Sequence, residues 1–262
     1  MISVIVPTYR NPKCMDICLE SALKGQSGVN EIICIIDGFV DESKDVQEKY
    51  KDTVNFLPLP ENKGMQYALN LGVWQATSDK ILIVNDDNVF PKDWDKILEE
   101  DYEPMTILTP NQIEKSPSIF DFVIKDFGTP DTFELDSFVN EEPNHREDLL
   151  TKDGGIFPLF LSKKFYMMVG GFDILYSSPF ICDWDFFLKC ELAGAKNLRS
   201  RKLNFYHFGS VATKNGNEAD KFNKSEQVAG ELYEYKWGFQ PFRYPDNSHS
   251  PKGDTVRGIK YE

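Results

Sequence analysis

The sequence predicts an α/β protein in which one mostly parallel, twisted sheet is flanked by helices. Two features of residues 1–100 predict this class. Short, continuously apolar runs alternate with amphipathic segments, a pattern typical of parallel strands that are buried on both faces and joined by helical crossovers. Polar residues also follow directly after three of the runs, at the carboxyl ends of strands, where such sheets bind their ligands.

The predicted elements of this half follow one another in regular order. Asn11 and Pro12 predict a helix start, because asparagine is a common N-cap and proline fits the first helical position. Gly25 predicts the end of that helix. The apolar runs predict strands over 2–6, 31–37, 54–57 and 80–84, and the segments between and after them predict helices over 12–25, 41–50, 64–76 and 91–100.

The second half of the chain is less regular. We interpret the acidic segment 110–153 as a solvated loop. Ser162 predicts the cap of a short helix that ends at Gly170 and Gly171, and Asp183 is expected to open an amphipathic helix. The other predicted elements are strands over 156–161 and 203–208, a helix over 220–237 and a loosely packed tail. Without an internal repeat or a linker, one domain with a C-terminal helical extension is the expected organisation.

Composition excludes several classes of protein. With 29 Lys+Arg against 42 Asp+Glu, the net charge of −13 argues against a nucleic-acid partner, which would require clustered basic residues. No apolar run approaches the ~20 residues of a transmembrane helix, and the first strand begins at residue 2, which leaves no room for a signal peptide. The five cysteines contain no C-x-x-C pair, so reduced thiols and a cytoplasmic location are expected.

Several common catalytic motifs are missing from the sequence. It contains no G-x-x-x-x-G-K-[ST], G-x-G-x-x-G, H-E-x-x-H or G-x-S-x-G. These absences argue against P-loop phosphate binding, the usual dinucleotide site, zincin proteolysis and a serine-hydrolase nucleophile.

The remaining candidates for chemistry are carboxylates and one histidine near strand and helix ends. Asn85, Asp86 and Asp87 directly follow the run 81–84. The two adjacent acids favour a divalent cation or, alternatively, simply start a turn. Asp183 and Asp185 would either favour the dipole at a helix start or act on a substrate. His207 follows an aromatic strand and is either a core histidine or a neutral metal ligand.

Taken in chain order, the motifs resemble those of family 2 of the inverting glycosyltransferases, which have the GT-A fold. The resemblance covers roughly residues 1–210 and rests on seven short motifs with plausible spacing. These are Val4–Tyr9, Ile36–Gly38, Asn62–Gly64 with Ala68, Asn70 and Gly72, Asn85–Asp87, Gly170–Asp173, Asp183–Asp185, and His207.

The resemblance implies a role for each matching residue. Asp183 matches the catalytic base, and Asp87 matches the last acid of the D-x-D motif, the principal ligand of Mn²⁺ or Mg²⁺, with His207 as a further metal or diphosphate contact. The nucleotide-binding residues it implies are Pro7, Thr8, Tyr9, Asp37, Lys63, Gly64, Asn85 and Asp86. The acceptor-side residues are Gly171, Phe172, Asp173, Trp184 and Asp185.

Two positions depart from the family pattern. Asn85 stands where the first acid of D-x-D is usual, and Cys182 stands where a glutamate usually precedes the base. Both changes bear on metal use and turnover.

The implied function is transfer of a sugar from a nucleoside-diphosphate sugar, with UDP as the first guess, to a saccharide, lipid-linked or protein acceptor with inversion. Residues 1–215 would form the GT-A domain, with a nucleotide-binding half (1–110) and an acceptor half (111–215), and 216–262 a helix and tail packed on it. A sugar nucleotidyltransferase and an impaired sugar-nucleotide-binding or scaffold protein are the alternatives. The aromatic-rich C-terminal helix is compatible with a homodimer.

Overall fold

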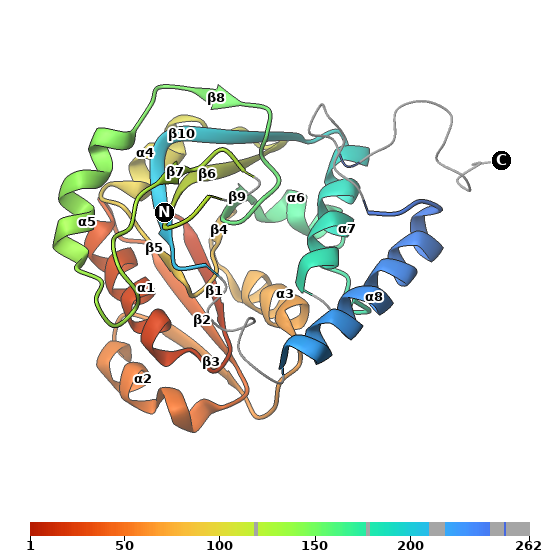
Figure 1. The fold of residues 1–262 in the computed structure, drawn as a ribbon, viewed down its shortest axis with the longest axis horizontal. Coiled ribbons are helices and arrows are strands. Elements are labelled where there is room, and N and C mark those ends of the chain that lie inside the picture. Colours follow the sequence, from red (N-terminus) through yellow and green to blue (C-terminus); the bar gives the residue numbers. More distant parts are fainter. Residues whose placement is uncertain (118–119, 177–178, 210–217, 242–248, 250–262) are drawn as a thin grey trace.

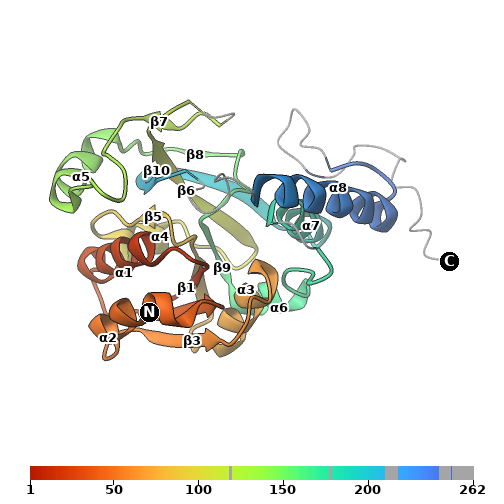
Figure 2. The same cartoon turned by 60° about the horizontal axis from the view of Figure 1, so that its bottom comes forward.

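One twisted sheet runs through the protein, with helices on both of its faces (Figures 1 and 2). The computed structural model describes the chain except residues 118–119, 177–178, 210–217, 242–248 and 250–262. The strand order is β3-β2-β1-β4-β9-β6-β10-β5, with β7 paired to β6 and β8 paired to β10. Most of the predicted tail therefore lies outside the described residues.

The amino-terminal half of the sheet is parallel and agrees with the predicted pattern. Its strands are β1 (Ser3–Thr8), β2 (Glu31–Asp37), β3 (Asn55–Leu59) and β4 (Lys80–Ile83). The connecting helices are α1 (Pro12–Gly25), the 3₁₀ helix η1 (Val40–Ser43), α2 (Lys44–Tyr50) and α3 (Met65–Gln75). The predicted α/β class is confirmed here.

The other half of the sheet is mixed. Its strands are β5 (Asn88–Val89), β6 (Thr106–Glu114), β7 (Val123–Ile124), β8 (Leu150–Thr151), β9 (Leu159–Ser162) and β10 (Lys196–His207). β9 is antiparallel to β4 and β6, whereas β10 is parallel to β6 and antiparallel to β5. The helices of this half are α4 (Trp94–Glu100), α5 (Leu135–Glu141), the 3₁₀ helix η2 (Glu142–His145), α6 (Lys163–Met168), α7 (Pro179–Leu192) and α8 (Glu218–Trp237).

Two predictions for this half were wrong. The segment 110–153 is not a solvated loop, since it contains the end of the buried strand β6 together with β7, α5, η2 and β8. Its first residues, 110–114, are buried because the polar side chains of β6 find partners inside the protein. Asn111 Nδ2, for example, donates to Asn204 Oδ1 at 2.7 Å. Helix α7 begins at Pro179, four residues before the predicted start at Asp183. Asp183 and Asp185 therefore lie beyond the first turn, so the helix dipole does not explain them.

Alternating residues of the strands feed two cores on opposite faces of the sheet. Ile5 of β1 belongs to the core that also contains residues of α3, α6, α7 and α8, while Val4 and Val6 belong to the core that contains residues of α1, α2 and α4. Helix α8 joins the first core through Ala229, Tyr233 and Trp237, and it lies beside α7 in both views (Figures 1 and 2). In the described part of the chain, no helix combines the length and the apolar character that crossing a membrane requires.

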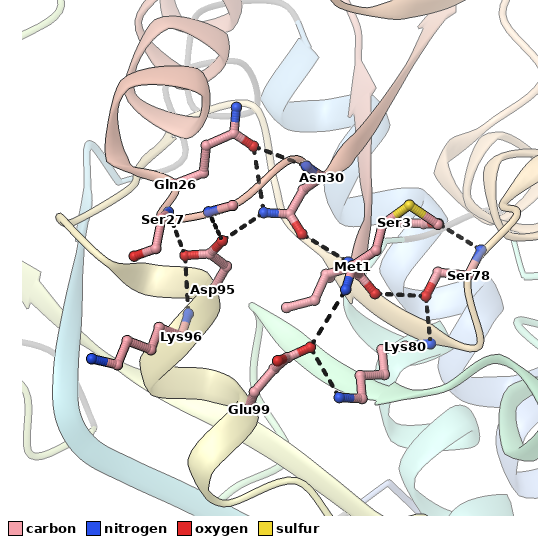
Figure 3. A network of polar contacts seen from close by, with 12 residues as sticks. Met1, Ser3, Gln26, Ser27, Asn30, Ser78, Lys80, Asp95, Lys96 and Glu99 are labelled. Carbon is pink, nitrogen blue, oxygen red and sulfur yellow. Dashed lines mark hydrogen bonds and ion pairs between the residues drawn. The ribbon is translucent and has the colours of Figure 1, made fainter.

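A network of polar contacts around Asp95 connects the amino ends of β1, β2 and β4 (Figure 3). The Asp95 carboxylate accepts hydrogen bonds from Ser27 N (2.7 Å), Gly28 N (2.9 Å) and Asn30 Nδ2 (2.7 Å). Burial alone would raise the pKa of Asp95, but these donors and Lys96 N hold it below its usual value. This carboxylate therefore stabilises the fold in its charged form.

Candidate functional site

Asp86 joins the carboxyl ends of β1 and β4. Thr8 donates its hydroxyl to Asp86 Oδ2 at 2.6 Å, and Asn11 Nδ2 donates to Oδ1 at 3.2 Å. Burial, with the adjacent charge of Asp87 second, raises the pKa of Asp86 to about 7. Asn11 precedes α1 as predicted but makes no capping hydrogen bond with its side chain. That side chain binds Asp86 instead.

The end of β2 is connected to the loop before α3. Asp37 accepts hydrogen bonds from Lys63 N (2.6 Å) and Gly64 N (2.9 Å). Burial raises the pKa of Asp37, although the two backbone amides act in the opposite direction. Gly64 has φ +90°, which a residue with a side chain rarely adopts. The three predicted residues therefore form one unit, whereas the Lys63 side chain pairs with Glu61 at the surface.

A small, shallow pocket lies between the carboxyl ends of β1 and β2. Thr8, Arg10, Gly38 and Phe39 contribute to its lining. Arg10 (φ +53°) and Phe39 (φ +55°) both have left-handed backbone conformations, and the Arg10 guanidinium lies 3.8 Å from the centroid of the Phe39 ring. Such strain at non-glycine residues concentrates at binding sites.

The other residues predicted to bind the nucleotide lie around this pocket or next to Asp86. Pro7 is inside β1, and Tyr9 follows it with its ring 5.4 Å from that of Phe39. Asn85 lies in the turn between β4 and β5, where its carbonyl oxygen accepts a hydrogen bond from Asn88 N at 3.2 Å. The sequence analysis missed Arg10 and Phe39, and only their position beside the predicted motifs could have indicated them.

Asp87 and His207 are brought together by strand pairing. His207 is opposite Asn88 in the β5–β10 pair, and Phe208 N donates to Asp87 O at 3.0 Å. His207 Nε2 lies 3.4 Å from Asp87 Oδ2, and Nδ1 lies 2.8 Å from Glu114 Oε1. Burial disfavours the charged imidazole, but the two carboxylates outweigh it and raise the pKa of His207 to about 10.

The chemistry of this cluster fits a hard divalent cation bound jointly with a substrate. Across the described ranges of the chain, no group of three or more His, Cys, Asp or Glu side chains is arranged to hold a metal ion. Asp87 and His207, once the imidazole has released its Nε2 proton, supply two ligands, which suffices where substrate phosphates and water complete the shell. Asn88, in register with His207, is buried, and neither polar atom of its side chain has a partner among the described residues. The site therefore keeps polar groups that a ligand can satisfy.

Asp183 lies on α7, and its carboxylate is 3.6 Å from Cys182 Sγ. Burial raises the pKa of Asp183 well above its usual value, and the charge of Glu226 on α8 adds to the rise. A carboxylate with a raised pKa is a stronger base once it has lost its proton. Glu226 was not singled out by the sequence.

Two of the residues predicted to face the acceptor connect α7 with α8. Asp185 is fully buried and accepts hydrogen bonds from Trp237 Nε1 (2.8 Å) and Tyr176 Oη (3.2 Å). Lys236 Nζ lies 2.8 Å from Asp185 and 2.7 Å from Asp173. These contacts give both acids a clear structural task, and their acceptor role stays a prediction.

The other three predicted acceptor-side residues surround this connection. The side chain of Asn70 in α3 binds the backbone of Phe172. Its Oδ1 accepts a hydrogen bond from Phe172 N at 3.0 Å, and its Nδ2 donates to Phe172 O at 2.8 Å. Gly171 has φ +61°, and an added Cβ would lie 2.6 Å from Asn70 Oδ1, so only glycine fits. The Trp184 ring packs edge-on against His249 with centroids 5.0 Å apart.

Comparison with known proteins identifies the family. The model of glycosyl transferase family 2 matches residues 3–136. An uncharacterized glycosyltransferase of Haemophilus influenzae is 27% identical over 196 residues, covering 72% of this chain and 61% of that protein. The human dolichyl-phosphate β-glucosyltransferase is 28% identical over 99 residues, covering 33% of this chain and 31% of that protein. The chain thus spans less than two thirds of the length of these relatives.

The fold has counterparts among solved structures. The crystal structure of S. aureus TarS superposes with a TM-score of 0.59 at 18% identity, covering 91% of this chain and 44% of TarS. TarS 1–349 in complex with UDP-GlcNAc gives a TM-score of 0.57 at 15% identity, covering 89% and 66% of the two chains. At this identity the likeness concerns the fold, and it agrees with the predicted GT-A class.

Proposed function

This chain belongs to glycosyl transferase family 2, and we propose that it transfers a sugar from a UDP-sugar to an acceptor hydroxyl with inversion at the anomeric carbon. The observation that carries the proposal is a set of three contacts at the carboxyl ends of the strands. Thr8 contacts Asp86 there, Asp37 holds the 63–64 loop, and Asp87 contacts His207. TarS 1–349 has been crystallised with UDP and with UDP-GlcNAc, which supports UDP as the carrier.

The donor would bind with its nucleoside in the pocket beside Thr8 and Phe39 and its diphosphate near Asp87 and His207. Backbone strain at Arg10 and Phe39 supports this placement, since both line the same pocket. Asp87 and His207 would hold Mn²⁺ or Mg²⁺, which when bound supplies positive charge to offset that of the departing diphosphate. The absence of a first acid at Asn85 leaves Asp87 as the main carboxylate for this task.

Asp183 would take the proton of the acceptor hydroxyl. An alcohol is a poor nucleophile and needs a base within about 2.6–3.2 Å of its oxygen. Asp183 lies on α7, outside the cluster of Asp86, Asp87 and His207, and burial raises its pKa. A base on the side opposite the diphosphate would lead to in-line displacement and inversion.

The acceptor is proposed to be a saccharide or a lipid-linked hydroxyl. Two relatives carry names of these kinds: the human dolichyl-phosphate β-glucosyltransferase and the poly-β-1,6-N-acetyl-D-glucosamine synthase of Staphylococcus aureus, the latter 29% identical over 94 residues, or 35% of this chain and 23% of that protein. Each match spans only about a third of this chain, so the proposal includes both classes of acceptor.

A thermal-melt panel of nucleoside diphosphates tests the proposal. UDP, GDP, CDP and ADP would each be added with Mn²⁺, with Mg²⁺ or with chelator. A ligand at about 100 times its Kd stabilises the fold by about 2.7 kcal/mol, and we expect that shift for UDP with a divalent cation. Asp87→Asn should lose the cation-dependent part, whereas Glu99→Gln, the same charge change at the amino end of the sheet, should keep it. A folded protein that responds to no nucleotide would favour a non-enzymatic scaffold.

A further inference from the structure

The structure places one carboxylate at the cluster of Asp87 and His207 that the sequence did not indicate. Glu114 is the last residue of β6, and it lies in the segment 110–153 that the sequence pattern predicted to be a loop. Its Oε1 lies 2.8 Å from His207 Nδ1, which is the ring nitrogen that faces away from Asp87. Both side chains are mostly buried, with 17% and 18% of their surface exposed. Glu114 therefore contacts the imidazole without facing Asp87 directly.

Strand pairing fixes this arrangement on both sides. His207 is in register with Glu114 in the β6–β10 pair and with Asn88 in the β5–β10 pair. Glu114 is also paired with Ile124 of β7, and its carbonyl oxygen accepts a hydrogen bond from Lys125 N at 2.9 Å. The side chains of residues paired in register project from the same face of a sheet. The position of the Glu114 carboxylate is thus set by the sheet and not by a loose loop.

The contact determines which ring nitrogen of His207 is presented to the site. When Nδ1–H donates to Glu114, Nε2 is left on the side of Asp87, 3.4 Å from Oδ2. Histidines that bind metals commonly donate their other N–H to a carboxylate, which fixes the ring and its tautomer. We propose that Glu114 is a positioning residue, which holds His207 so that Nε2 and the Asp87 carboxylate converge on one divalent cation. This inference rests on the proposed function of Asp87 and His207.

The test separates the reach of residue 114 from its charge. Glu114→Gln removes the charge but keeps an Oε1 that can accept from Nδ1–H, whereas Glu114→Asp keeps the charge on a side chain one methylene shorter. Free Mn²⁺ would be measured by electron paramagnetic resonance during titration of the protein with UDP present. We expect Glu114→Asp and Glu114→Ala to weaken Mn²⁺ binding by about 10-fold or more, and Glu114→Gln to stay within about threefold of wild type.

Controls distinguish this inference from the function on which it rests. His207→Ala should lose most Mn²⁺ binding, and Glu103→Gln, an exposed acid just before β6 that pairs with Lys196, should leave it unchanged. Normal Mn²⁺ binding in Glu114→Asp and Glu114→Ala, with loss in His207→Ala, would overturn the role of Glu114 alone. If Glu114→Gln lost Mn²⁺ binding and Glu114→Asp bound Mn²⁺ normally, the charge of residue 114 and not its reach would matter. That result would also overturn the positioning role. A wild-type protein that binds no Mn²⁺ with UDP would remove the proposed cation site together with the role of Glu114.

Discussion

The two ends of the sheet use buried aspartates in opposite ways. At the amino end, Asp95 accepts hydrogen bonds from the backbone amides of Ser27 and Gly28, and its pKa lies below the usual value. At the carboxyl end, burial beside Asp87 raises the pKa of Asp86 to about 7. A charged aspartate therefore stabilises the fold at the amino end of the sheet, whereas at the carboxyl end a charged aspartate costs free energy.

The balance of burial and neighbouring charge against hydrogen-bond donors explains the difference in pKa. The loop before β2 and the first turn of α4 direct several N–H groups at Asp95, as Figure 3 shows. Asp86 also receives donors, from Thr8 and Asn11, but a second carboxylate follows it in sequence. Proteins accept such unfavourable charge where a site requires it. Substitutions at the two ends should therefore have opposite effects on stability and on activity.

The largest effect is expected for Asp183→Asn. Removing the proposed base should reduce the rate of sugar transfer by about 10²–10⁴-fold, while UDP binding should stay within about twofold of wild type, because Asp183 lies on α7 and not at the strand ends near Asp86. Transfer from a UDP-sugar and the Kd of UDP would be measured on the same sample. If UDP binding fell in parallel with the rate, Asp183 would belong to the donor site and not act as the base.

Asp95→Asn should destabilise the fold without affecting the site. An amide oxygen cannot replace a carboxylate that accepts from four donors, so we expect a loss of about 1–3 kcal/mol in the free energy of unfolding at pH 7. Because the folded pKa is lowered, this contribution is present above the unfolded pKa of about 3.9 and disappears as the pH falls through the folded value. Urea unfolding at pH 7 and near pH 3 would measure it. UDP binding by the folded variant should be unchanged, and a weaker Kd would contradict the separation of the two ends.

The first half of the fold could be predicted from the sequence because its strands need nothing from distant residues to be recognised. The run at Ile2–Val6 is apolar except for Ser3, and the run at Ile32–Ile36 is continuously apolar, as strands buried on both faces require. The polar residues that follow them were then expected to converge. Thr8 and Asp86 do so in the structure, although 78 positions separate them in the chain.

The strand β6 could not be predicted because its burial depends on partners far away in sequence. Thr109 donates to Ile156 O at 3.0 Å, and Asn111 binds Asn204. A single sequence does not reveal such pairings, so the polar residues of β6 resembled a solvated loop. Glu114 was missed with the strand that carries it. From the apolar pattern alone, the candidate site could therefore be predicted only where its residues followed apolar runs. Lys63, Gly64 and Asp183 were indicated by the family resemblance instead.

Asp86→Asn should have the opposite sign to Asp95→Asn. The folded pKa of about 7 lies above the unfolded value, so the contribution of Asp86 is fully present below about pH 3.9 and is lost as the pH rises through 7. The amide avoids this loss, and in chelator at pH 8 we expect the variant to be more stable than wild type by about 1–2 kcal/mol. Urea unfolding from pH 5 to pH 8 would follow the difference between the two proteins. If the difference in the free energy of unfolding shrank from pH 5 to pH 8, the environment of Asp86 would not disfavour its charged form.

The smallest effect is expected for Glu99→Gln, which tests what holds the amino end of the sheet. Glu99 Oε1 lies 2.9 Å from Lys80 Nζ and 3.7 Å from the terminal amine of Met1, and roughly a third of each of the Glu99 and Lys80 side chains is exposed (34% for Lys80, 36% for Glu99). Exposed pairs of this kind contribute less than about 1 kcal/mol, and salt screens them. We therefore expect the midpoint of urea unfolding to differ little between Glu99→Gln and wild type, and the remaining difference to shrink with added salt. If Glu99→Gln cost as much as Asp95→Asn, ion pairs and not buried amide donors would hold this end, and the contrast with Asp86 would lose its physical cause.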